Sequence, residues 1–457
     1  MIHRFSHNGV NILMDINSGS VHVLDDAAYA VSGAVAPGMT EECPEDLIRS
    51  LRDEFTEEQI RSAYAELYEL EQNGYLFADD DYIDIAKAIP QGAPVKALCL
   101  HVAHDCNLRC KYCFASTGTY DGDQRKIMSF ETAKAAIDFV VEKSGSRRNI
   151  EVDFFGGEPL MAMDTVKRTV EYARSLEQEK NKHFRFTITT NGVALNDEYI
   201  DYINENMDNV VLSLDGRREV NDEMRPTVNG KGSYDLIVPK FKKLVDQRDK
   251  SLDYYVRGTF TSKNLDFSKD VLSIADAGFD QLSVEPVTSE PGTGYDLKES
   301  DLPAIFDEYD HLCDIMRERK AQGKSFNFFH FMVDLQQGPC VIKRLRGCGA
   351  GYEYVAVTPD GEIYPCHQFV GKPEFCQGSV FDKSFDQGIS DTFANLNVCT
   401  RPKCRDCWAK FYCSGGCAAA NFNMNGNLTD PYEMGCELEK KRLECAIYLK
   451  AAELTGQ

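Results

Sequence analysis

The chain has 457 residues, of which 43% are apolar and 27% charged, a composition typical of globular proteins. The sequence contains no run of about 18 apolar residues, the length that a membrane-spanning helix needs, and its N-terminal residues lack the apolar region of a secretory signal. The 50 Lys and Arg against 73 Asp and Glu give a net charge of −23, which disfavours binding to the phosphate backbone of nucleic acids. We therefore expect a cytoplasmic protein that binds neither nucleic acid nor membrane.

The 17 cysteines are the unusual feature of this composition. A reducing cytosol keeps thiols free, so clustered cysteines there usually bind metal or carry out redox chemistry. Three of them fall at positions 106, 110 and 113, and 11 fall between 340 and 445. Both groups therefore predict metal or redox sites.

Residues 1–88 are predicted to form a first unit. The pattern over 11–24 predicts a β-hairpin. A helix is expected to begin after Thr56, because Gln59 stands where a capping box requires it. Strands followed by helices suggest a winged-helix-like module, and the acidic, Pro- and Gly-containing segment 79–92 predicts a linker.

Residues 95–300 alternate between apolar, strand-like segments and helical ones. Six strands separated by helices imply parallel pairing through right-handed crossovers, and hence a doubly wound sheet or a complete or partial barrel. In either fold, ligands gather at the C-terminal ends of the strands. Asp164 is expected to cap the helix after the second strand. The predicted strands are Ala97–Val102, Glu151–Phe155, Phe184–Thr189, Val210–Leu214, Tyr254–Thr259 and Gln281–Val287.

Two further segments complete the chain. Residues 301–345 predict an amphipathic bridging helix and a linker. Residues 346–457 are rich in Cys and Gly and show little periodicity, so we expect them to bury little apolar area. Such a segment needs metal ions or clusters to hold it together.

The strongest motif is Cys106-x3-Cys110-x2-Cys113, directly after the first strand of the 95–300 region. Three thiolates on one loop can hold three irons of a [4Fe–4S] cube and leave the fourth iron open. A structural zinc ion, the less favoured alternative, requires a fourth protein ligand close by. His101 and His104 are available, but His101 should lie within the strand.

The second motif, Gly156-Gly157-Glu158-Pro159, follows the second strand. Glycine lets the backbone approach a ligand closely, and Glu158 offers an acceptor for a ligand ammonium group. Alone, this motif is compatible with an ordinary turn. One βα unit after the cysteine loop, it resembles the radical S-adenosylmethionine (SAM) enzymes, in which the open iron binds the amino and carboxylate groups of SAM. The resemblance implies an α/β fold with a partial (β/α)6 barrel.

The same resemblance implies further contacts with SAM. Arg225 is a candidate partner of the SAM carboxylate because a guanidinium group suits planar, bidentate partners, and a surface ion pair is the alternative. Ser213 and Asp215 resemble the polar residues that contact the ribose and methionine portions of SAM. The complete set of SAM-binding candidates is Tyr112, Gly156, Gly157, Glu158, Pro159, Asn191, Ser213, Asp215, Arg225 and Arg257.

The C-terminal cysteines resemble the seven-cysteine pattern of a SPASM domain, which implies two auxiliary [4Fe–4S] clusters and three clusters in all. Cys340 is a spare fourth ligand for the first auxiliary cluster, or that position is open to a substrate thiol, which we favour. Paired zinc sites are the alternative. The resemblance implies Cys348, Cys366 and Cys417 for the first auxiliary cluster, and Cys404, Cys407, Cys413 and Cys436 for the second.

Several segments are similar to the maturases of SCIFF peptides, which are small precursors with six cysteines in forty-five residues. These segments are residues 1–5, the hairpin over 15–25, Cys106–Phe114 and residues 364–369. The similarity implies that the N-terminal unit binds the leader of a cysteine-rich precursor by adding a β-strand to its sheet. It also implies an electron donor such as flavodoxin or ferredoxin.

The implied reaction begins when the reduced first cluster cleaves SAM to methionine and a 5′-deoxyadenosyl radical. This radical abstracts hydrogen from a substrate residue, for which threonine is expected. The carbon radical then couples with a cysteine sulfur to form a thioether, and an electron leaves through an auxiliary cluster. The cofactor supplies the radical chemistry, and the protein supplies orientation and exclusion of water.

Two other classes of function compete with this hypothesis. A radical enzyme of the same kind could form formylglycine or a carbon–carbon crosslink. Sulfatase-maturing relatives carry an aspartate base where this chain has His367, which disfavours the formylglycine product. A non-catalytic iron–sulfur electron carrier, or a zinc-containing peptide-binding protein, would need no SAM pocket.

Overall fold

The computed structural model describes residues 1–88, 92–120, 124–335 and 340–455. Part of the predicted linker, at 89–91, and part of the predicted 301–345 bridge, at 336–339, lie outside the described residues. Among the described residues, no helix combines the length and apolar character that crossing a bilayer requires.

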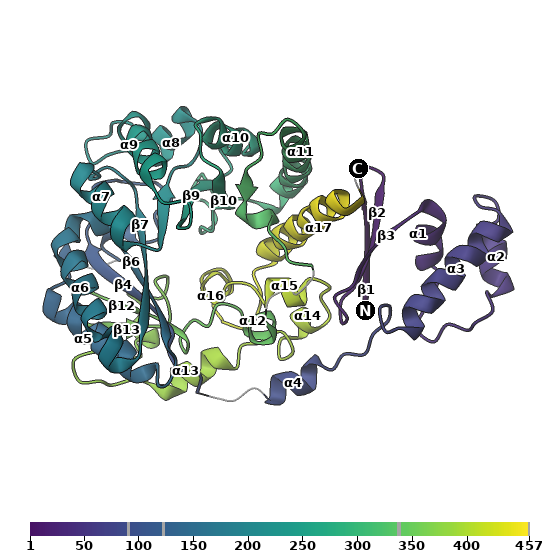
Figure 1. The fold of residues 1–457 in the computed structure, drawn as a ribbon, viewed down its shortest axis with the longest axis horizontal. Coiled ribbons are helices and arrows are strands. Elements are labelled where there is room, and N and C mark those ends of the chain that lie inside the picture. Colours follow the sequence, from purple (N-terminus) through teal and green to yellow (C-terminus); the bar gives the residue numbers. More distant parts are fainter. Residues whose placement is uncertain (89–91, 121–123, 336–339, 456–457) are drawn as a thin grey trace.

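The N-terminal unit places a three-stranded antiparallel sheet, in the order β1-β2-β3, before three helices (Figure 1). The predicted hairpin is confirmed, and so is the capping box, in which Thr56 and Gln59 each bond to the backbone of the other. The elements are β1 (Ile2–His7), β2 (Val10–Asp15), β3 (Val21–Leu24), α1 (Asp26–Ser32), α2 (Glu45–Leu51) and α3 (Glu57–Gln72).

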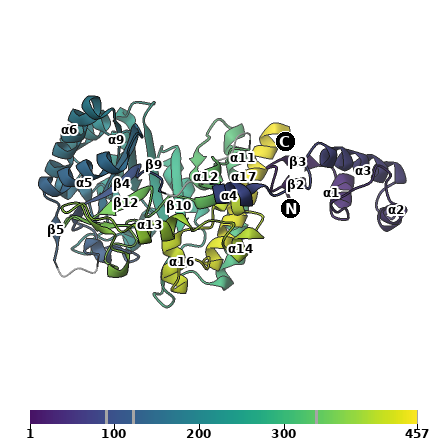
Figure 2. The same ribbon diagram turned by 90° about the horizontal axis from the view of Figure 1, so that it is seen from below.

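The central strand of this sheet, β2, is buried on both faces. Leu13 of β2 packs with the core of α1, α2 and α3, whereas Ile12 and Met14 belong to the core that contains Tyr448 of the C-terminal helix α17 (Glu433–Thr455). The N-terminal unit is therefore joined to the rest of the molecule through a shared core. A short helix, α4 (Tyr82–Ala88), occupies the predicted linker and lies apart from α1–α3, beside the C-terminal helices (Figure 2).

The six predicted strands of the central region form one parallel sheet in chain order. Because that order never reverses, the sheet has no switch point, and the helices cover its outer face only (Figure 1). The sheet stays open between its end strands, so it is a partial barrel, as predicted. Its strands are β4 (Ala97–His104), β6 (Asn149–Gly156), β7 (His183–Thr190), β8 (Asn209–Ser213), β9 (Asp253–Phe260) and β10 (Gln281–Pro286).

The covering helices have mostly the predicted positions. One detail is wrong, because Asp164 does not cap α6. The 3-10 turn Pro159–Ala162 runs directly into that helix, so Ala162 takes the cap position and Asp164 lies in the first turn. The helices are α5 (Phe130–Lys143), α6 (Met163–Lys180), α7 (Asp197–Asn206), α8 (Arg218–Met224), α9 (Tyr234–Gln247), α10 (Ser268–Asp276) and α11 (Leu302–Ala321).

The C-terminal region continues the barrel. Strand β12 (Tyr354–Val357) pairs in parallel with β4, and β13 (Glu362–Tyr364) and β14 (Gly378–Ser379) extend the sheet outward. The expectation that this region buries little apolar area is wrong for α17, whose Leu438, Ile447 and Tyr448 are buried. Its other helices are α12 (Val341–Arg346), α13 (Gln387–Ala394), α14 (Pro402–Arg405), α15 (Lys410–Cys413) and α16 (Ala418–Asn425).

Candidate active site

The first cysteine motif lies on the loop after β4, at the C-terminal edge of the parallel sheet. Backbone bonds fix this loop, since Arg109 N donates to Pro226 O at 2.8 Å and Lys111 N donates to Met224 O at 2.9 Å. The amide of Asn191, at the end of β7, lies 3.6 Å from Cys106 Sγ. The three cysteine residues are partly exposed, and burial raises the pKa of Cys106 to about 12 and that of Cys110 to about 11.

The two glycines of the second motif lie against the chain's own backbone. A Cβ on Gly156 would lie 2.3 Å from Ala103 O, and one on Gly157 would lie 2.2 Å from Asp105 O. Gly156 also has a φ of +120°, which side chains other than glycine rarely adopt. The motif thus lets β6 pass close beside the start of the cysteine loop, and that contact fixes the loop in position.

Glu158 is buried and accepts three internal hydrogen bonds. Its Oε1 accepts from Leu160 N at 3.0 Å and from Thr190 Oγ1 at 2.7 Å, and its Oε2 accepts from Asn191 N at 2.8 Å. Burial raises the pKa of Glu158 to about 7, and these donors oppose the rise. Glu158 therefore ties the ends of β6 and β7 together, beside the cysteine loop.

Asp215 and Arg225 are both buried and bind each other. Arg225 Nε lies 2.9 Å from Asp215 Oδ1. The hydroxyl of Tyr112 donates to the same carboxylate at 2.7–2.8 Å, and Thr259 N donates to it at 2.9 Å. Three of the predicted SAM contacts thus form one internal group in this structure, and it connects the cysteine loop to the ends of β8 and β9.

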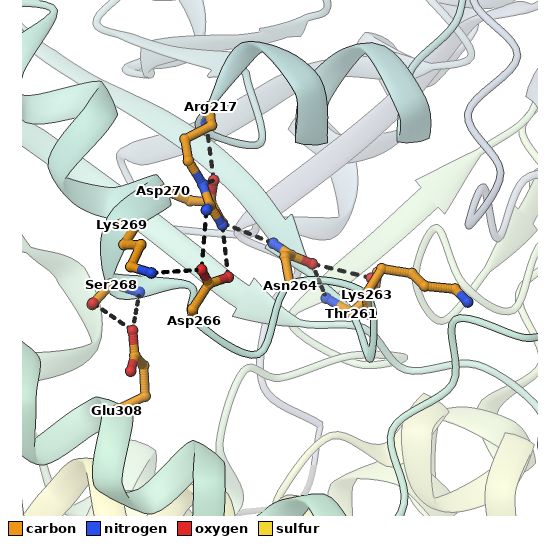
Figure 3. A network of polar contacts seen from close by, with 9 residues as sticks. All are labelled: Arg217, Thr261, Lys263, Asn264, Asp266, Ser268, Lys269, Asp270 and Glu308. Atoms are coloured by element: carbon orange, nitrogen blue, oxygen red, sulfur yellow. Dashed lines mark hydrogen bonds and ion pairs between the residues drawn. The ribbon is translucent and has the colours of Figure 1, made fainter.

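A second network, which sequence reasoning missed, holds the segment that follows Asp215 (Figure 3). Arg217 donates to Asp266 and Asp270 at 2.7–3.1 Å, and Asn264 also donates to Asp270. A Cβ on Gly216 would lie 2.2 Å from the side chain of Asp270, so the segment passes very close to α10. These contacts position the end of β8.

The remaining predicted SAM contacts lie at the same edge of the sheet. Ser213 of β8 is in register with Arg257 of β9, and Arg257 donates to Glu285 Oε2 of β10 at 2.6 Å. Pro159 is buried behind Glu158. The structure thus brings most of the predicted SAM-binding residues to the C-terminal edge of the sheet, and Arg225, at the end of α8, reaches this edge through its pair with Asp215.

The C-terminal cysteines of the two predicted sets lie close to one another, since Cys413 and Cys436 of the second set line a cavity together with Cys417 of the first. Burial raises the pKa of Cys366 to about 12, and the charges of Cys417 and Cys348 contribute to that rise. In the same way, Cys413 and Cys404 are close enough to Cys436 for their charges to affect one another. The second set lines one cavity of about 750 Å³, which contains Cys404, Cys407, Cys413 and Cys436.

The chemistry of these donors fits iron–sulfur clusters. Among the described residues, no three His, Cys, Asp or Glu side chains converge tightly enough to share one metal ion. A [4Fe–4S] cube takes one thiolate per iron, so its ligands stand farther apart than those of a single zinc ion.

Cys340, the predicted spare ligand of the first auxiliary set, lies exposed at the start of α12.

A further group of residues, which sequence reasoning missed, joins the N-terminal unit to the second set of C-terminal cysteines. The ring of His3 stacks on Trp408 with centroids 3.7 Å apart, and Trp408 lines the cavity of the second set. Lys410 Nζ lies 2.9 Å from Asp80 Oδ2, and Tyr82 packs on Phe411. The segment between Cys407 and Cys413 is therefore held from two sides, which its sequence position did not indicate.

Comparison with known proteins decides the family. The Radical SAM superfamily model matches residues 100–258, and the SPASM model, an iron–sulfur cluster-binding domain, matches residues 348–408. An uncharacterized protein of Methanocaldococcus jannaschii is 31% identical over 290 residues, which are 64% of this chain and 90% of that protein. The chain belongs to the radical SAM superfamily. It is a radical SAM enzyme with a SPASM domain, and its cofactors are SAM and iron–sulfur clusters.

Other relatives of this radical SAM enzyme are more distant. The cysteine-type anaerobic sulfatase-maturating enzyme of Clostridium novyi is 26% identical over 330 residues, 68% of this chain and 85% of that enzyme. The structure of anSMEcpe with bound AdoMet superposes with a TM-score of 0.64 at 21% identity, over 80% of this chain and 100% of that one. Streptococcus suis SuiB bound to precursor peptide SuiA has a TM-score of 0.53 at 17% identity, over 94% and 97%. These likenesses confirm the predicted fold.

Proposed function

We propose that this radical SAM enzyme installs a thioether between a cysteine sulfur and a carbon of another residue, threonine, in a ribosomally made, cysteine-rich precursor peptide. What supports the proposal is the proximity of three thiols, those of Cys348, Cys366 and Cys417, whose charges affect one another. A cluster with three protein ligands keeps one iron for a fourth sulfur. A substrate cysteine bound there would be an oriented thiolate, which is the nucleophile that thioether formation needs.

The first motif has a separate task in this proposal. Cys106, Cys110 and Cys113 would hold the SAM-binding cluster, which when bound supplies the electron for reductive cleavage of SAM. The protein orients SAM at the strand ends through residues such as Asn191 and Ser213. A small electron carrier such as flavodoxin or ferredoxin would reduce the cluster.

The relatives support a peptide as the substrate. SuiB, whose structure contains a precursor peptide, matches this chain over its N-terminal unit as well as the barrel. Strands β1 and β3 each have a single neighbour in the N-terminal sheet, and β1 faces α17 through His3 and His7. The edge of β3 is therefore the proposed docking site for the leader, which would add a fourth strand there.

A formylglycine product, as made by sulfatase-maturating relatives, is less well supported. His367 occupies the position of the expected aspartate base, and burial lowers its pKa to about 4. Its ring packs on Phe114 and Phe155, and its Nδ1 lies 3.4 Å from Tyr354 OH. A residue enclosed in this way serves packing better than proton transfer.

The proposal is tested by anaerobic reaction of the cluster-loaded enzyme with SAM, dithionite and a precursor encoded beside its gene. We expect the precursor to lose two hydrogen atoms per crosslink, and tandem mass spectrometry to place the link between Cys and Thr. Deuterium on the Thr carbon should appear in 5′-deoxyadenosine. A formylglycine product, or a link that does not involve sulfur, would contradict the thioether assignment.

The open position of the first auxiliary cluster has its own test. If Cys340 is not a ligand, Cys340→Ala should retain its full iron content, and adding precursor should change the absorption of the cluster. A precursor that lacks cysteine should leave the spectrum unchanged and serves as the control. Loss of iron in Cys340→Ala, or identical spectra with all precursors, would show that the protein alone completes this cluster.

A further inference from the structure

The carboxylate of Asp153 faces the inside of the barrel. Asp153 lies on β6 between Val152 and Phe154, which are buried on the outer, helix-covered face. Because strand side chains alternate, Asp153 points to the opposite side, as does Phe155, which packs with the inner cluster that contains Cys99. The position lies three residues, roughly 10 Å, before Gly156 and the SAM-binding edge.

This carboxylate is not satisfied by the protein. Asp153 Oδ1 is sealed from solvent and has no hydrogen-bond partner among the residues that the structure describes. A buried polar atom without a partner is costly, and in folded proteins such atoms are rare. Glu158 on the same strand shows the contrast, since three donors satisfy its carboxylate. This oxygen is therefore free to bind a partner inside the barrel.

The charged and titratable groups around Asp153 are few. Burial raises its pKa to about 7, Arg257 of β9 opposes this rise, and Glu151 of its own strand adds to it. Cys99 of β4, Tyr354 of β12 and Tyr120 of the loop after β4 also lie within its field. Arg257 is already paired with Glu285.

Asp153 also lies near the proposed site of the substrate sulfur. Asp153 is in register with Cys99 of the neighbouring strand β4, and Cys99 belongs to the buried cluster against which Cys366 of the first auxiliary set packs. The histidines of this region are engaged elsewhere: His101 contacts His104 at 3.2 Å, and His367 contacts Tyr354. Glu285 of β10 lines a cavity with Cys417 of that set but is paired with Arg257, whereas no ion pair to Asp153 is found among the described residues.

We propose that Asp153 is the base that accepts the thiol proton of the precursor cysteine, an inference that rests on the proposed thioether function. The S–H bond breaks and its proton moves to Asp153. The sulfur forms a bond to the substrate carbon that has lost a hydrogen atom, and one electron leaves to an oxidised [4Fe–4S] cluster. Without a base, only a precursor whose cysteine has already ionised in solution, at a pKa near 8.5, could bind the open iron as a thiolate.

The test compares Asp153→Asn with Glu151→Gln, which removes a carboxylate from the same face of the same strand. At pH 7 we expect Asp153→Asn to form thioether at least about 100-fold more slowly, the usual contribution of a general base. Transfer of deuterium from the precursor to 5′-deoxyadenosine should continue, because Asp153 has no part in that step. The deficit should shrink as the pH rises toward 8.5, where the thiol ionises unaided. Glu151→Gln should behave as wild type.

Two measurements do not depend on a variant's activity. The infrared difference spectrum between wild type and Asp153→Asn should contain a protonated-carboxyl band that disappears with an apparent pKa near 7. With wild type, the thioether rate should rise with pH through that pKa for the cysteine precursor. A selenocysteine precursor, whose selenol is ionised at neutral pH, should show no such rise.

Each outcome bears on one hypothesis. Thioether formation within threefold of wild type in Asp153→Asn, or equal pH profiles for the two precursors, would overturn the assignment of Asp153 and leave the proposed function intact. If Asp153→Asn binds less iron than Glu151→Gln, its activity is not informative. The assignment of Asp153 then depends on the wild-type pH profiles with the cysteine and selenocysteine precursors. If wild type itself makes no thioether, the proposed function fails.

Discussion

Arg225 is, in this structure, one half of a buried ion pair with Asp215. Removing one partner of such a pair leaves an uncompensated charge in the interior, which costs about 3–5 kcal/mol. We expect Arg225→Ala to lower the free energy of unfolding by that amount in the absence of SAM. The exposed Arg218, paired with Asp235 on the surface, is the control, and Arg218→Ala should cost about 1 kcal/mol or less. Thermal unfolding without SAM measures both, and equal effects would contradict the structural role of Arg225.

The three cysteines of the β4 loop have a role that is separable from the rest of the iron. Replacing Cys106, Cys110 and Cys113 together by alanine should abolish 5′-deoxyadenosine formation, because SAM cleavage requires the cluster they are proposed to hold. Most of the remaining iron should stay bound, since the C-terminal sets lie on other segments. Chromatography of the nucleoside product and iron analysis check both parts. SAM cleavage by the triple variant under anaerobic reduction would rule the assignment out.

Strand β1 and the segment around Trp408 are coupled elements. His3 stacks on Trp408 and also contacts Glu444 of α17 at 2.9 Å. Aromatic stacking of this kind contributes about 0.5–1.5 kcal/mol, so His3→Ala should loosen β1 and expose the indole ring to water. Trp408 is the only tryptophan, and its emission maximum should shift to longer wavelength. The exposed Arg49 of the same unit provides the control, and a shift in Arg49→Ala as large as in His3→Ala would argue against this coupling.

Strand β3 has one free edge in the N-terminal sheet, where the leader is proposed to bind. Backbone pairing slows hydrogen exchange, so leader binding to the full-length enzyme should protect amide groups of β3. Peptide-resolved hydrogen exchange with and without leader measures this. The amide groups of β1 should change little, because that strand faces α17. Protection confined to β1, or none at leader concentrations of tens of micromolar, would contradict docking at β3.

The N-terminal unit, the barrel and the SPASM domain meet at the second auxiliary set. Replacing Cys404 and Cys407 by alanine should remove one cluster, a third of the iron, because three clusters are proposed. Binding of metal by ligands spread over a core-poor segment is part of its folding free energy. The Trp408 emission should therefore change as well. The control is Cys376→Ala, which changes a cysteine outside both auxiliary sets and should keep the wild-type iron content and Trp408 emission spectrum. Full iron content in the double variant would contradict the assignment.

Local sequence patterns were sufficient for most of the architecture. The predicted strands match β4 and β6–β10 to within a few residues, because alternation and apolar runs reflect the strand itself. The capping box at Thr56 also depends only on neighbouring residues. The predicted cap at Asp164 was wrong because a 3-10 turn over Pro159–Ala162 leads directly into α6 and moves the start of the helix to Met163.

By itself, the sequence determined the fold class and the SAM and iron–sulfur chemistry, since both depend on residue types and motif spacing along the chain. The assignment of cysteines to the two auxiliary sets stays a prediction. Only the tertiary structure decided what the side chains bind. It paired Arg225 with Asp215 and stacked His3 on Trp408. It also left Asp153 Oδ1 without a hydrogen-bond partner among the described residues. The physical reason is that these features depend on residues far apart in the sequence, whose geometry arises only when the barrel closes around its inner face and the N-terminal unit packs on the C-terminal region.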